Sequence, residues 1–443
     1  MSETDPSEGH KLSESAALHD RALDVFPGGV SHNIRYFSPH PLYIERAEGP
    51  YIWDADGNAY LDYWMNHMAS VLGHSHPAVV DAVREQLEDG LHYGAVNEKA
   101  LELGEKVQEY VPSAERLRFC SSGTEATMYA VRLARAYTDC PIVLKAQGGW
   151  HGGNSELSNA IHAPFDVPST DGRPPGANDS LRTYPVNDRA TVERLLDEHA
   201  GDVAAIIIEP WMLAGGGLSV DESFLRFLRA ESNRRDIVLI FDEVVTGFRF
   251  SPGSYQKRVG ITPDLTTLGK FLGGGLPVGG LAGRAELFEA ARPDIDVPPG
   301  KSVIAGGGTF SMNPMTATAG LASLAVVESE PVYEYTESQA QRVRDRLTDL
   351  FDDLGIEGVV LGESSMFLTH FDPETTLNTV EAVETRTNRQ ALATYHRRLF
   401  EHGHYFLPTH VGSVSYQTTE QHLDGLVEAS RVVLSEMRDE GLV

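Results

Sequence analysis

The chain has 443 residues, of which 64 are Asp or Glu and 36 are Lys or Arg, so its formal net charge is −28. A field of this sign repels nucleic acid and anionic membranes, and we expect neither as a partner. The two cysteines, Cys120 and Cys140, are too few for a disulfide framework or a cysteine metal site. Because no apolar run reaches the length of a membrane span and the polar N-terminus does not resemble a signal peptide, we expect a cytoplasmic protein.

Lysine is scarce in this sequence, and arginine supplies most of the positive charge. An acidic, lysine-poor surface fits a cytoplasm with molar salt, in which ions screen the repulsion between like charges. An acidic enzyme from a low-salt organism is the alternative. We favour a halophilic source on composition alone.

The first part of the chain shows helix and hairpin signals. Residues 1–15 are predicted to be a disordered acidic tail, and residues 16–26 a helix that ends at Pro27-Gly28-Gly29. Short strands are expected between residues 43 and 63, around the turn signal Asp56-Gly57-Asn58. Helices are predicted at 77–89 and 97–110.

Strands and helices alternate in the centre of the chain, which is typical of a mostly parallel sheet. Strands are predicted at 116–120, 141–145, 203–208 and 237–241, and a helix at 125–137. The last two of these strands are uninterrupted aliphatic runs, as expected for strands covered on both faces. Residues 155–179 are rich in Pro, Gly, Ser and Asp and are interpreted as a long functional loop.

The C-terminal part is predicted to be a smaller α+β domain. Two helices are expected beyond Gly320, then short strands near Val359 and Phe367 and a terminal helix at 420–439. We therefore predict an α/β protein in which residues 16–70 contribute to the small domain, residues 71–325 form the large domain, and residues 326–443 form the C-terminal small domain.

Ser121-Ser122-Gly123-Thr124-Glu125 lies between a predicted strand and a predicted helix. A helix N-terminus presents free N–H groups and a partial positive charge, so it binds phosphate well. The spacing of Ser122 and Glu125 also suits a capping box, and the two roles are compatible.

Asp242 lies at the carboxyl end of the predicted strand in Ile240-Phe241-Asp242-Glu243-Val244. In open α/β sheets, ligands bind beyond these ends of the strands. A carboxylate there could keep a pyridine nitrogen protonated, bind a metal or cap the next helix.

Lys270 follows an apolar strand and precedes the glycine turn Gly273-Gly274-Gly275. A lysine in such a dry setting loses its charge easily and becomes a nucleophile. Its amine could form an imine with an aldehyde cofactor and then move protons.

A metal site was considered because His74-Ser75-His76 has the spacing of two ligands. These histidines precede Pro77 and a helix, away from the buried strands, and the further strand-end histidines that a metal-dependent hydrolase needs are missing. We interpret them as polar turn residues and expect no metal.

Five blocks of the sequence resemble, in order, those of class III aminotransferases, in particular the branch with glutamate-1-semialdehyde aminomutase and β-phenylalanine-type aminotransferases. The blocks are SSGTEATMYAVRLAR, GGWHGG, IFDEVVTGFR, PDLTTLGKFLGGGLPVGG and GGGTFSMNPMTATAG. The resemblance runs from about Arg21 to Val327 and continues weakly to the C-terminus. It implies a fold-type I transferase that uses pyridoxal 5′-phosphate (PLP), with a mostly parallel seven-stranded-type sheet in the large domain and a smaller α+β domain from both chain ends.

The resemblance also implies roles for the matching residues around the cofactor. Ser122, Gly123 and Thr124 would hold the phosphate. Trp150, where tyrosine is more usual, and Val244 would pack on the two faces of the pyridine ring. Asp242 would pair with the pyridine nitrogen, and Lys270 would form the Schiff base. Gln256 falls on a family position close to the cofactor.

Two further residues relate the site to its substrate and to a second subunit. Arg35 falls where this branch places an arginine that binds the substrate carboxylate, for which its planar fork is suited. Thr309 resembles the threonine that reaches the phosphate in the neighbouring subunit. A homodimer with shared active sites is therefore expected.

The sequence departs from the aminomutase pattern at two positions. Gly412 stands where aminomutases carry a glutamate, and Ala214 replaces an asparagine near the cofactor hydroxyl. The loop at 155–179 also lacks the small-residue pattern of the aminomutase lid. These departures favour an aminotransferase that moves an amino group between a β- or ω-amino carboxylate and a keto acid.

Three other functions remain as alternatives. The nearest is glutamate-1-semialdehyde 2,1-aminomutase, an isomerase that supplies a tetrapyrrole precursor. A metal-dependent hydrolase and an inactive binding protein with the same fold are more remote.

Overall fold

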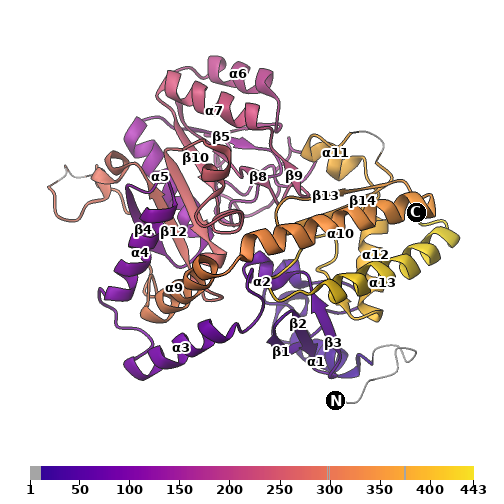
Figure 1. Ribbon diagram of the computed structural model, residues 1–443. Helices are drawn as coiled ribbons and strands as arrows, with labels where there is room; N and C mark the ends of the chain where they lie inside the picture. Colours follow the sequence, from indigo (N-terminus) through magenta and orange to yellow (C-terminus); the bar gives the residue numbers. More distant parts are fainter. Residues whose placement is uncertain (1–10, 297, 299, 374–375) are drawn as a thin grey trace.

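The computed structural model describes residues 11–443 except 297, 299 and 374–375. Figure 1 shows a large part built around one sheet, beside a second part in which the indigo N-terminal and the yellow C-terminal segments lie together. No helix in the described ranges is both long and apolar enough to cross a bilayer.

The large sheet has seven strands, and most neighbouring strands in it are parallel. Their spatial order is β4 (Arg116–Cys120), β12 (Gly279–Gly283), β11 (Leu265–Gly269), β10 (Val238–Asp242), β7 (Val203–Ile208), β5 (Ile142–Ala146) and β6 (Leu181–Tyr184). Only β12 runs antiparallel to its neighbours among these seven. The predicted mostly parallel sheet is thus confirmed, and the four predicted strands match within one residue.

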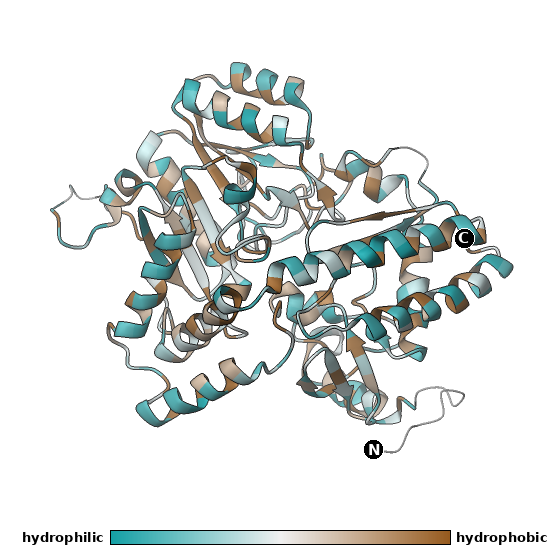
Figure 2. Ribbon diagram, in the orientation of Figure 1, coloured by the Kyte–Doolittle hydropathy of each residue, from teal (hydrophilic) through white to brown (hydrophobic). Residues whose placement is uncertain are grey.

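Helices cover both faces of this sheet because alternate strand residues point to opposite sides. Ala205 and Ile207 of β7 pack in the core cluster of α5 (Gly123–Thr138), whereas Ile206 and Ile208 pack in that of α7 (Glu222–Arg235). The adjoining α6 (Arg189–Glu198) lies beside α7 (Figure 1). Figure 2 shows brown strands between helices whose outer sides are teal, as expected for a sheet buried on both faces.

Three helices pack beside one edge of the large sheet. They are α3 (Pro77–Asp89), α4 (Glu98–Tyr110) and α9 (Pro314–Ser329). The Asn97 side chain caps α4 by accepting a hydrogen bond from the backbone N–H of Ala100 at 2.9 Å. The predicted helices at 77–89 and 97–110 are confirmed, with Asn97 as the cap of the second.

The second part contains a sheet drawn from both ends of the chain. Strands β1 (Ile44–Glu48), β2 (Tyr51–Asp54) and β3 (Ala59–Asp62) form a meander, and β15 (His404–Tyr405) adds to β3 in parallel. The turn between β2 and β3 is the predicted one at residues 56–58. This pairing confirms that the smaller part is built from both chain ends.

A three-stranded sheet and long helices complete the C-terminal part. The sheet contains β13 (Gly358–Leu361), β14 (Met366–Phe371) and β16 (Gly412–Ser413), and the helices are α10 (Val332–Leu354), α11 (Val380–Thr385), α12 (Arg389–Glu401) and α13 (Glu420–Asp439). The remaining short elements are α2 (Met65–Met68), α8 (Tyr255–Val259), β8 (Trp211–Met212) and β9 (Leu218–Ser219). The domain boundaries at residues 70 and 325 stay a prediction, and the second falls within α9.

The N-terminal tail was predicted too long. Residues 1–10 lie outside the described residues, but α1 (Ser13–Leu23) begins at Ser13, so the disorder predicted for residues 13–15 is wrong. The cause is Asp56, whose carboxylate accepts hydrogen bonds from the Ser13 hydroxyl and from the N–H groups of Glu14 and Ser15, at 3.2, 2.8 and 3.0 Å. An anion at a helix N-terminus is stabilising, and this one lies 41 to 43 residues further along the chain than its three donors.

The predicted functional loop at 155–179 contains neither helix nor strand. The carboxylate of Glu384, in α11, holds it by accepting hydrogen bonds from His162 Nδ1 at 2.7 Å and from the N–H of Ala163 at 2.5 Å. The loop is therefore tied to the C-terminal part of the chain.

Candidate active site

The predicted site residues meet at the carboxyl edge of the large sheet. Lys270 follows β11, Asp242 ends β10, and Glu209 follows β7. Trp150 and His151 lie in the loop after β5, and the Ser122 loop follows β4. Since parallel strands end at the same edge, the order of strands alone brings these segments together.

Lys270 is held in a strained conformation at the first position after β11. Its φ is +47°, in the left-handed region that costs a non-glycine residue about 1–3 kcal/mol. Burial lowers the pKa of the Lys270 amine, and the nearby carboxylates of Asp242 and Glu209 partly offset this effect. A lysine with a lowered pKa more readily provides the neutral amine that acts as a nucleophile.

Asp242 is buried, and its carboxylate is fixed by three donors. It accepts hydrogen bonds from His151 Nδ1 at 2.7 Å, from the Thr267 hydroxyl at 2.9 Å and from the N–H of Val244 at 3.1 Å. Burial lowers the pKa of His151, which favours the neutral ring with its proton on Nδ1. The motif GGWHGG contained His151, but its role as the partner of Asp242 was not predicted.

The loop after β4 has the features of a phosphate cradle. Ser122 is the N-cap of α5, and its hydroxyl accepts a hydrogen bond from the N–H of Glu125 at 3.2 Å. The Glu125 carboxylate accepts from the N–H of Ser121 at 2.8 Å, one residue earlier than in a capping box. The cap is thus confirmed, and the first-turn N–H groups of Gly123 and Thr124 have no partner within the helix.

Two glycines allow the segments of the site to approach each other closely. A Cβ on Gly123 would lie 2.9 Å from both Val244 methyl groups, and a Cβ on Gly152 would lie 2.3 Å from the Thr124 hydroxyl oxygen. Gly152 also has a φ of +86°. The lack of a side chain at Gly123 and Gly152 therefore lets Val244 and Thr124 pack closely against the backbone of the site.

We predict that Gly152→Ala lowers the free energy of unfolding by about 1–3 kcal/mol and weakens PLP binding, because the methyl group displaces Thr124. Urea unfolding of the PLP-free protein and PLP titration measure the two effects. Gly201→Ala is the matched control, since Gly201 has a φ of +87° but open space around its Cβ position. Equal losses in the two variants would show that backbone strain, rather than the contact with Thr124, is responsible.

Trp150 and Glu209 form one wall of the site. The Trp150 side chain is 48% exposed, and its backbone N–H donates to Glu209 Oε1 at 2.8 Å. Burial, together with the nearby charge of Asp242, raises the pKa of Glu209 to about 7. Glu209 was not predicted as a site residue, although the dipeptide Glu209-Pro210 follows a buried strand.

Lys145 in β5 is a second buried lysine, and the sequence analysis gave it no role. Its ammonium donates to the carbonyls of Ala146 at 3.2 Å and Ala160 at 3.3 Å. Among the described residues no carboxylate forms an ion pair with it, and burial lowers its pKa to about 7. Lys145 therefore joins the large sheet to the loop at 155–179.

We predict that Lys145→Met removes part of the pH dependence of stability. In the wild type, the folded lysine loses its proton near pH 7, whereas the unfolded one keeps it to about pH 10.4. The free energy of unfolding should therefore rise from pH 7 to 10, by up to about 1.4 kcal/mol per pH unit. Urea unfolding at pH 7 and 9 should show a smaller rise in Lys145→Met than in the control Lys257→Met; an unchanged rise would contradict the assignment.

A left-handed turn lies opposite Lys270. All four residues of α2 have positive φ, between +44° and +65°, although none is glycine. Such a conformation costs roughly 1–2 kcal/mol per residue, so the surrounding structure must offset this cost over four successive residues. The turn places His67 close enough to Lys270 for their charges to interact, a feature that helix and strand propensities could not predict.

Arg35 and Thr309 lie at the border of the site. Arg35 is exposed in a short turn, donates to the Ser31 hydroxyl at 3.4 Å and has no carboxylate partner among the described residues. Thr309 is also exposed and follows Gly308, whose Cβ position lies 3.4 Å from the Ser121 hydroxyl oxygen. Gln256, by contrast, is buried and donates to Glu243 and Thr266 at 3.1 and 2.9 Å.

Comparison with known proteins identifies the family. The model of class III aminotransferases matches residues 35–415. The chain belongs to the class III aminotransferase family. It is 38% identical to a glutamate-1-semialdehyde 2,1-aminomutase of Methanopyrus kandleri, over 96% of this chain and 98% of that protein.

Solved class III structures share the fold. An omega-transaminase of Sphaerobacter thermophilus superimposes with a TM-score of 0.89 and is 33% identical, with 96% of this chain and 98% of that chain covered. A β-phenylalanine aminotransferase of Variovorax paradoxus gives a TM-score of 0.86 at 29% identity, with 96% and 95% covered. The fold-type I architecture is therefore confirmed.

Class III aminotransferases use PLP, and the residues of this site fit that cofactor. The N-terminus of α5 suits a phosphate, and the Asp242 carboxylate and Lys270 amine suit a pyridine nitrogen and an aldehyde. Asp242 is buried at this site, and Gly123 approaches Val244 closely. The protein is a PLP-dependent enzyme.

His74 of the His74-Ser75-His76 motif contacts a carboxylate of the smaller part of the molecule. His74 Nε2 contacts Asp62 Oδ2 at 2.8 Å, and the His74 backbone pairs with Gly49. Within the described residues no group of three or more His, Cys, Asp or Glu side chains could hold a metal ion.

Proposed function

We propose that Lys270 is the lysine that binds the cofactor aldehyde and that Asp242 pairs with the pyridine nitrogen. Bound PLP supplies an electron sink for the substrate carbon that loses its proton. The Lys270 amine, once released, takes that proton and returns it at the neighbouring position. His151 holds Asp242 in place through its Nδ1 proton.

The other proposed contacts of the cofactor are supported by the resemblance and by the position of these residues at the carboxyl edge of the sheet. We propose that Ser122, Gly123 and Thr124 bind the phosphate at the start of α5 and that Trp150 and Val244 cover the two faces of the ring. Arg35 is proposed to bind the substrate carboxylate, which the absence of a carboxylate partner among the described residues supports. Thr309 is proposed to contact the phosphate in a second subunit.

We propose that the enzyme moves an amino group within or between small carboxylate-bearing substrates, and that glutamate-1-semialdehyde is the first substrate to test. The observation that carries this choice is the 38% identity to a named aminomutase over nearly the full length of both chains. It supports the aminomutase alternative better than the intermolecular transfer that the sequence analysis preferred.

An intermolecular aminotransferase of β- or ω-amino acids is the second candidate. It is supported by Gly412 and Ala214, which depart from the aminomutase pattern, and by the solved omega-transaminase at 33% identity. Gly412 lies buried in β16, where the ring of Phe406 leaves no room for a side chain. A glutamate at that position would therefore need a different local backbone.

The experiment is a product analysis with the PLP-loaded enzyme. An aminomutase converts glutamate-1-semialdehyde to 5-aminolevulinate without an added acceptor. An aminotransferase converts the visible absorption of the lysine-bound cofactor to the near-ultraviolet band of its amino form when a β-amino acid is added, and it releases a keto acid. Neither product nor spectral change would refute both candidates.

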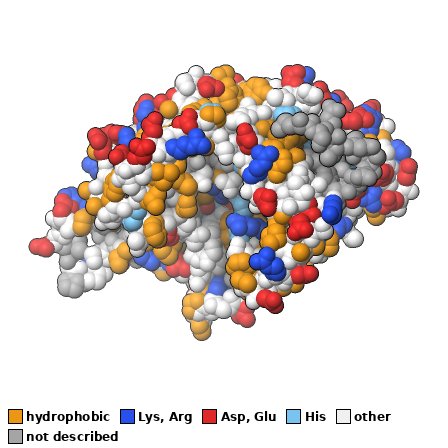
Figure 3. Space-filling model, turned by 90° about the horizontal axis from the view of Figure 1, so that it is seen from below, with side chains coloured by type: hydrophobic (Ala, Val, Ile, Leu, Met, Phe, Trp, Pro, Cys, Tyr) orange, Lys and Arg blue, Asp and Glu red, His pale blue; other side chains and the backbone are white. Residues whose placement is uncertain are grey.

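We propose that the protein is a homodimer. Several large apolar side chains around α3, α4 and the loop at residue 310 are exposed, namely Leu87, Leu91, Val96, Leu101 and Phe310. Figure 3 shows hydrophobic side chains gathered on one face of the molecule, which is typical of an interaction surface. Light scattering of the purified protein should give twice the mass of 48.4 kDa.

We propose that the enzyme acts in the cytoplasm of a halophilic organism. Figure 3 shows many acidic side chains along the rim of the molecule, and the net charge of −28 supports a requirement for screening ions. Thermal unfolding in 0.1 M and 2 M KCl tests this proposal: the melting temperature should rise with salt.

A further inference from the structure

Three histidines and a tryptophan form a continuous row of rings beside Lys270. The rings of His32 and His67 stack with centroids 5.6 Å apart, and the rings of His67 and Trp64 are 4.8 Å apart. Trp64 in turn meets His410 at 5.2 Å, edge to face. The row thus joins the Arg35 turn, the left-handed turn α2 and the loop before β16.

The charges around His67 are positive or can become so. Arg35, His32, Lys270 and His410 all act on His67 from their own segments, and each disfavours a proton on it. Burial and these charges lower the pKa of His67 to about 4, while burial also lowers the pKa values of His32 and His410. The carboxylates of Asp242 and Glu209 act on the Lys270 amine and raise its pKa, and the Arg249 guanidinium lowers it.

No described residue hydrogen-bonds to the rings of His32 or His67, so their nitrogens remain available to a ligand. His32 is exposed and His67 is half-buried. A second nitrogen is also available on His410, whose Nδ1 donates to the Pro408 carbonyl at 2.8 Å. The row therefore offers several ring nitrogens without a hydrogen-bond partner among the described residues, and His67 brings it close to Lys270.

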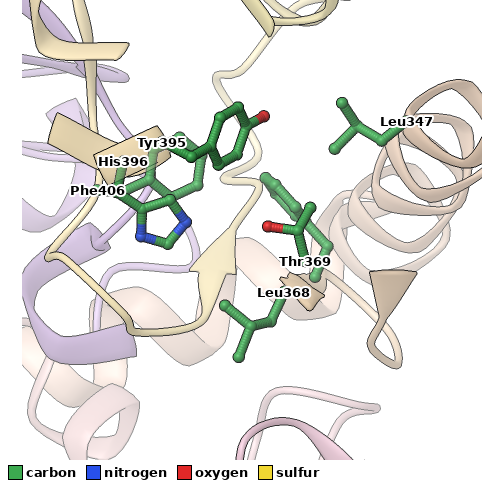
Figure 4. Close-up of a pocket in the computed structure, with 7 residues that line it drawn as sticks. Leu347, Leu368, Thr369, Tyr395, His396 and Phe406 are labelled. Carbon is green, nitrogen blue, oxygen red and sulfur yellow. The ribbon is translucent and has the colours of Figure 1, made fainter. Parts of the chain in front are cut away.

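Buried contacts hold two of these rings in place. The guanidinium of Arg249, which is fully buried, donates to the carbonyl of Met68 at the end of the left-handed turn and to Ser365 and Ser413 at 2.9 and 3.0 Å. His396 Nδ1 accepts a hydrogen bond from the N–H of Thr409 at 3.2 Å, next to His410. Figure 4 shows His396 beside Phe406, on which its ring stacks at 4.7 Å.

We propose that His32, His67 and His410 form, with Arg35, an anion subsite that binds the substrate carboxylate. When the carboxylate binds, the histidine row takes up a proton from solution. This inference rests on the proposed function, which gives Arg35 the carboxylate, and it adds the histidines as residues that determine specificity.

The sign of the pH effect follows from the positions of the charges. Without substrate, His67 is neutral at pH 7 because its pKa is about 4. A carboxylate placed against the ring raises that pKa by about 1–3 units. The enzyme with bound carboxylate then holds more protons than the free enzyme, so the carboxylate should bind more tightly as the pH falls from 8 to 5.5. The affinity should increase by about fourfold if the pKa of His67 rises by two units.

The test uses pentanoate as an unreactive carboxylate and pentanol as its uncharged counterpart. Each is titrated into the PLP-loaded enzyme at pH 5.5 to 8, with the visible absorption of the cofactor as the signal, and proton uptake is measured with an indicator dye in weak buffer. We expect pentanoate binding to strengthen at the lower pH, about fourfold for a two-unit rise in the pKa of His67, with net proton uptake, and pentanol to show neither effect.

Variants distinguish a histidine row that takes up a proton from one whose rings only pack against their neighbours. His67→Phe keeps a ring in the row but cannot ionise, so pentanoate should still bind through Arg35 with a dissociation constant that no longer varies with pH. His402→Phe, at an exposed histidine beyond α12, is the matched control and should behave as the wild type. His32→Phe provides a second test if His67→Phe does not fold.

Two results would overturn the proposal. One is pentanoate binding without proton uptake in the wild type, and the other is an unchanged pH dependence in His67→Phe and His32→Phe. Turnover of the amino substrates is measured separately, so a failure of the proposed reaction is distinguished from a failure of the histidine subsite.

Discussion

Lys270→Ala should lose amine transfer by on the order of 10⁴-fold, since the variant lacks both the nucleophile and the group that moves the proton. Steady-state assay with the substrate found in the product analysis gives kcat, and absorption shows whether the cofactor is still bound covalently.

Lys257→Ala is the matched control for Lys270→Ala. Lys257 is an exposed lysine of α8, away from the carboxyl edge of the sheet, and its replacement should leave both kcat and the cofactor spectrum unchanged. If Lys270→Ala kept a visible band that borohydride fixes to the protein, another lysine would bind the cofactor. Lys145 would then be the first residue to examine, because it is buried nearby with a lowered pKa.

Asp242→Asn should lower kcat by about 10²- to 10³-fold, the size of effect caused by removing one preorganised electrostatic group. The amide keeps the shape of the side chain but brings no negative charge to hold a proton on the pyridine nitrogen. It also places an amide against His151 Nδ1, which favours a change of tautomer. Single-turnover absorption measurements separate the chemical step from product release.

Asp349→Asn, on the exposed side of α10, is the control for the loss of one negative charge. A second variant, His151→Phe, removes the partner of Asp242 while it leaves the carboxylate. We expect an intermediate loss of kcat in this variant. An activity of Asp242→Asn within threefold of the wild type would refute the assignment of Asp242.

Five of the seven strands of the large sheet could be predicted because a short local pattern marks each of them, whereas β6 and β12 were not predicted. The short, uninterrupted aliphatic runs of β7 and β10 favour strands covered on both faces. The site residues Ser122, Asp242 and Lys270 could be predicted for a related reason. Each lies at or just after the carboxyl end of a strand, and the carboxyl ends of parallel strands lie at the same edge of the sheet.

Other features depend on contacts between distant segments, which local patterns do not contain. The start of α1 depends on Asp56, and the position of His67 depends on a left-handed turn that residue propensities disfavour. The role of Lys145 depends on the carbonyl of Ala160 in a loop without regular structure. In each case tertiary contacts outweigh the local preference of the sequence.

The pairing of Leu61 in β3 with His404 in β15 has a consequence for synthesis on the ribosome. The edge of β3 stays unpaired until almost the whole polypeptide has emerged, so the nascent chain carries an open strand edge for most of its translation. Loss of the last 40 residues would leave that edge permanently exposed. Stop codons late in the gene should therefore yield aggregated rather than merely inactive protein.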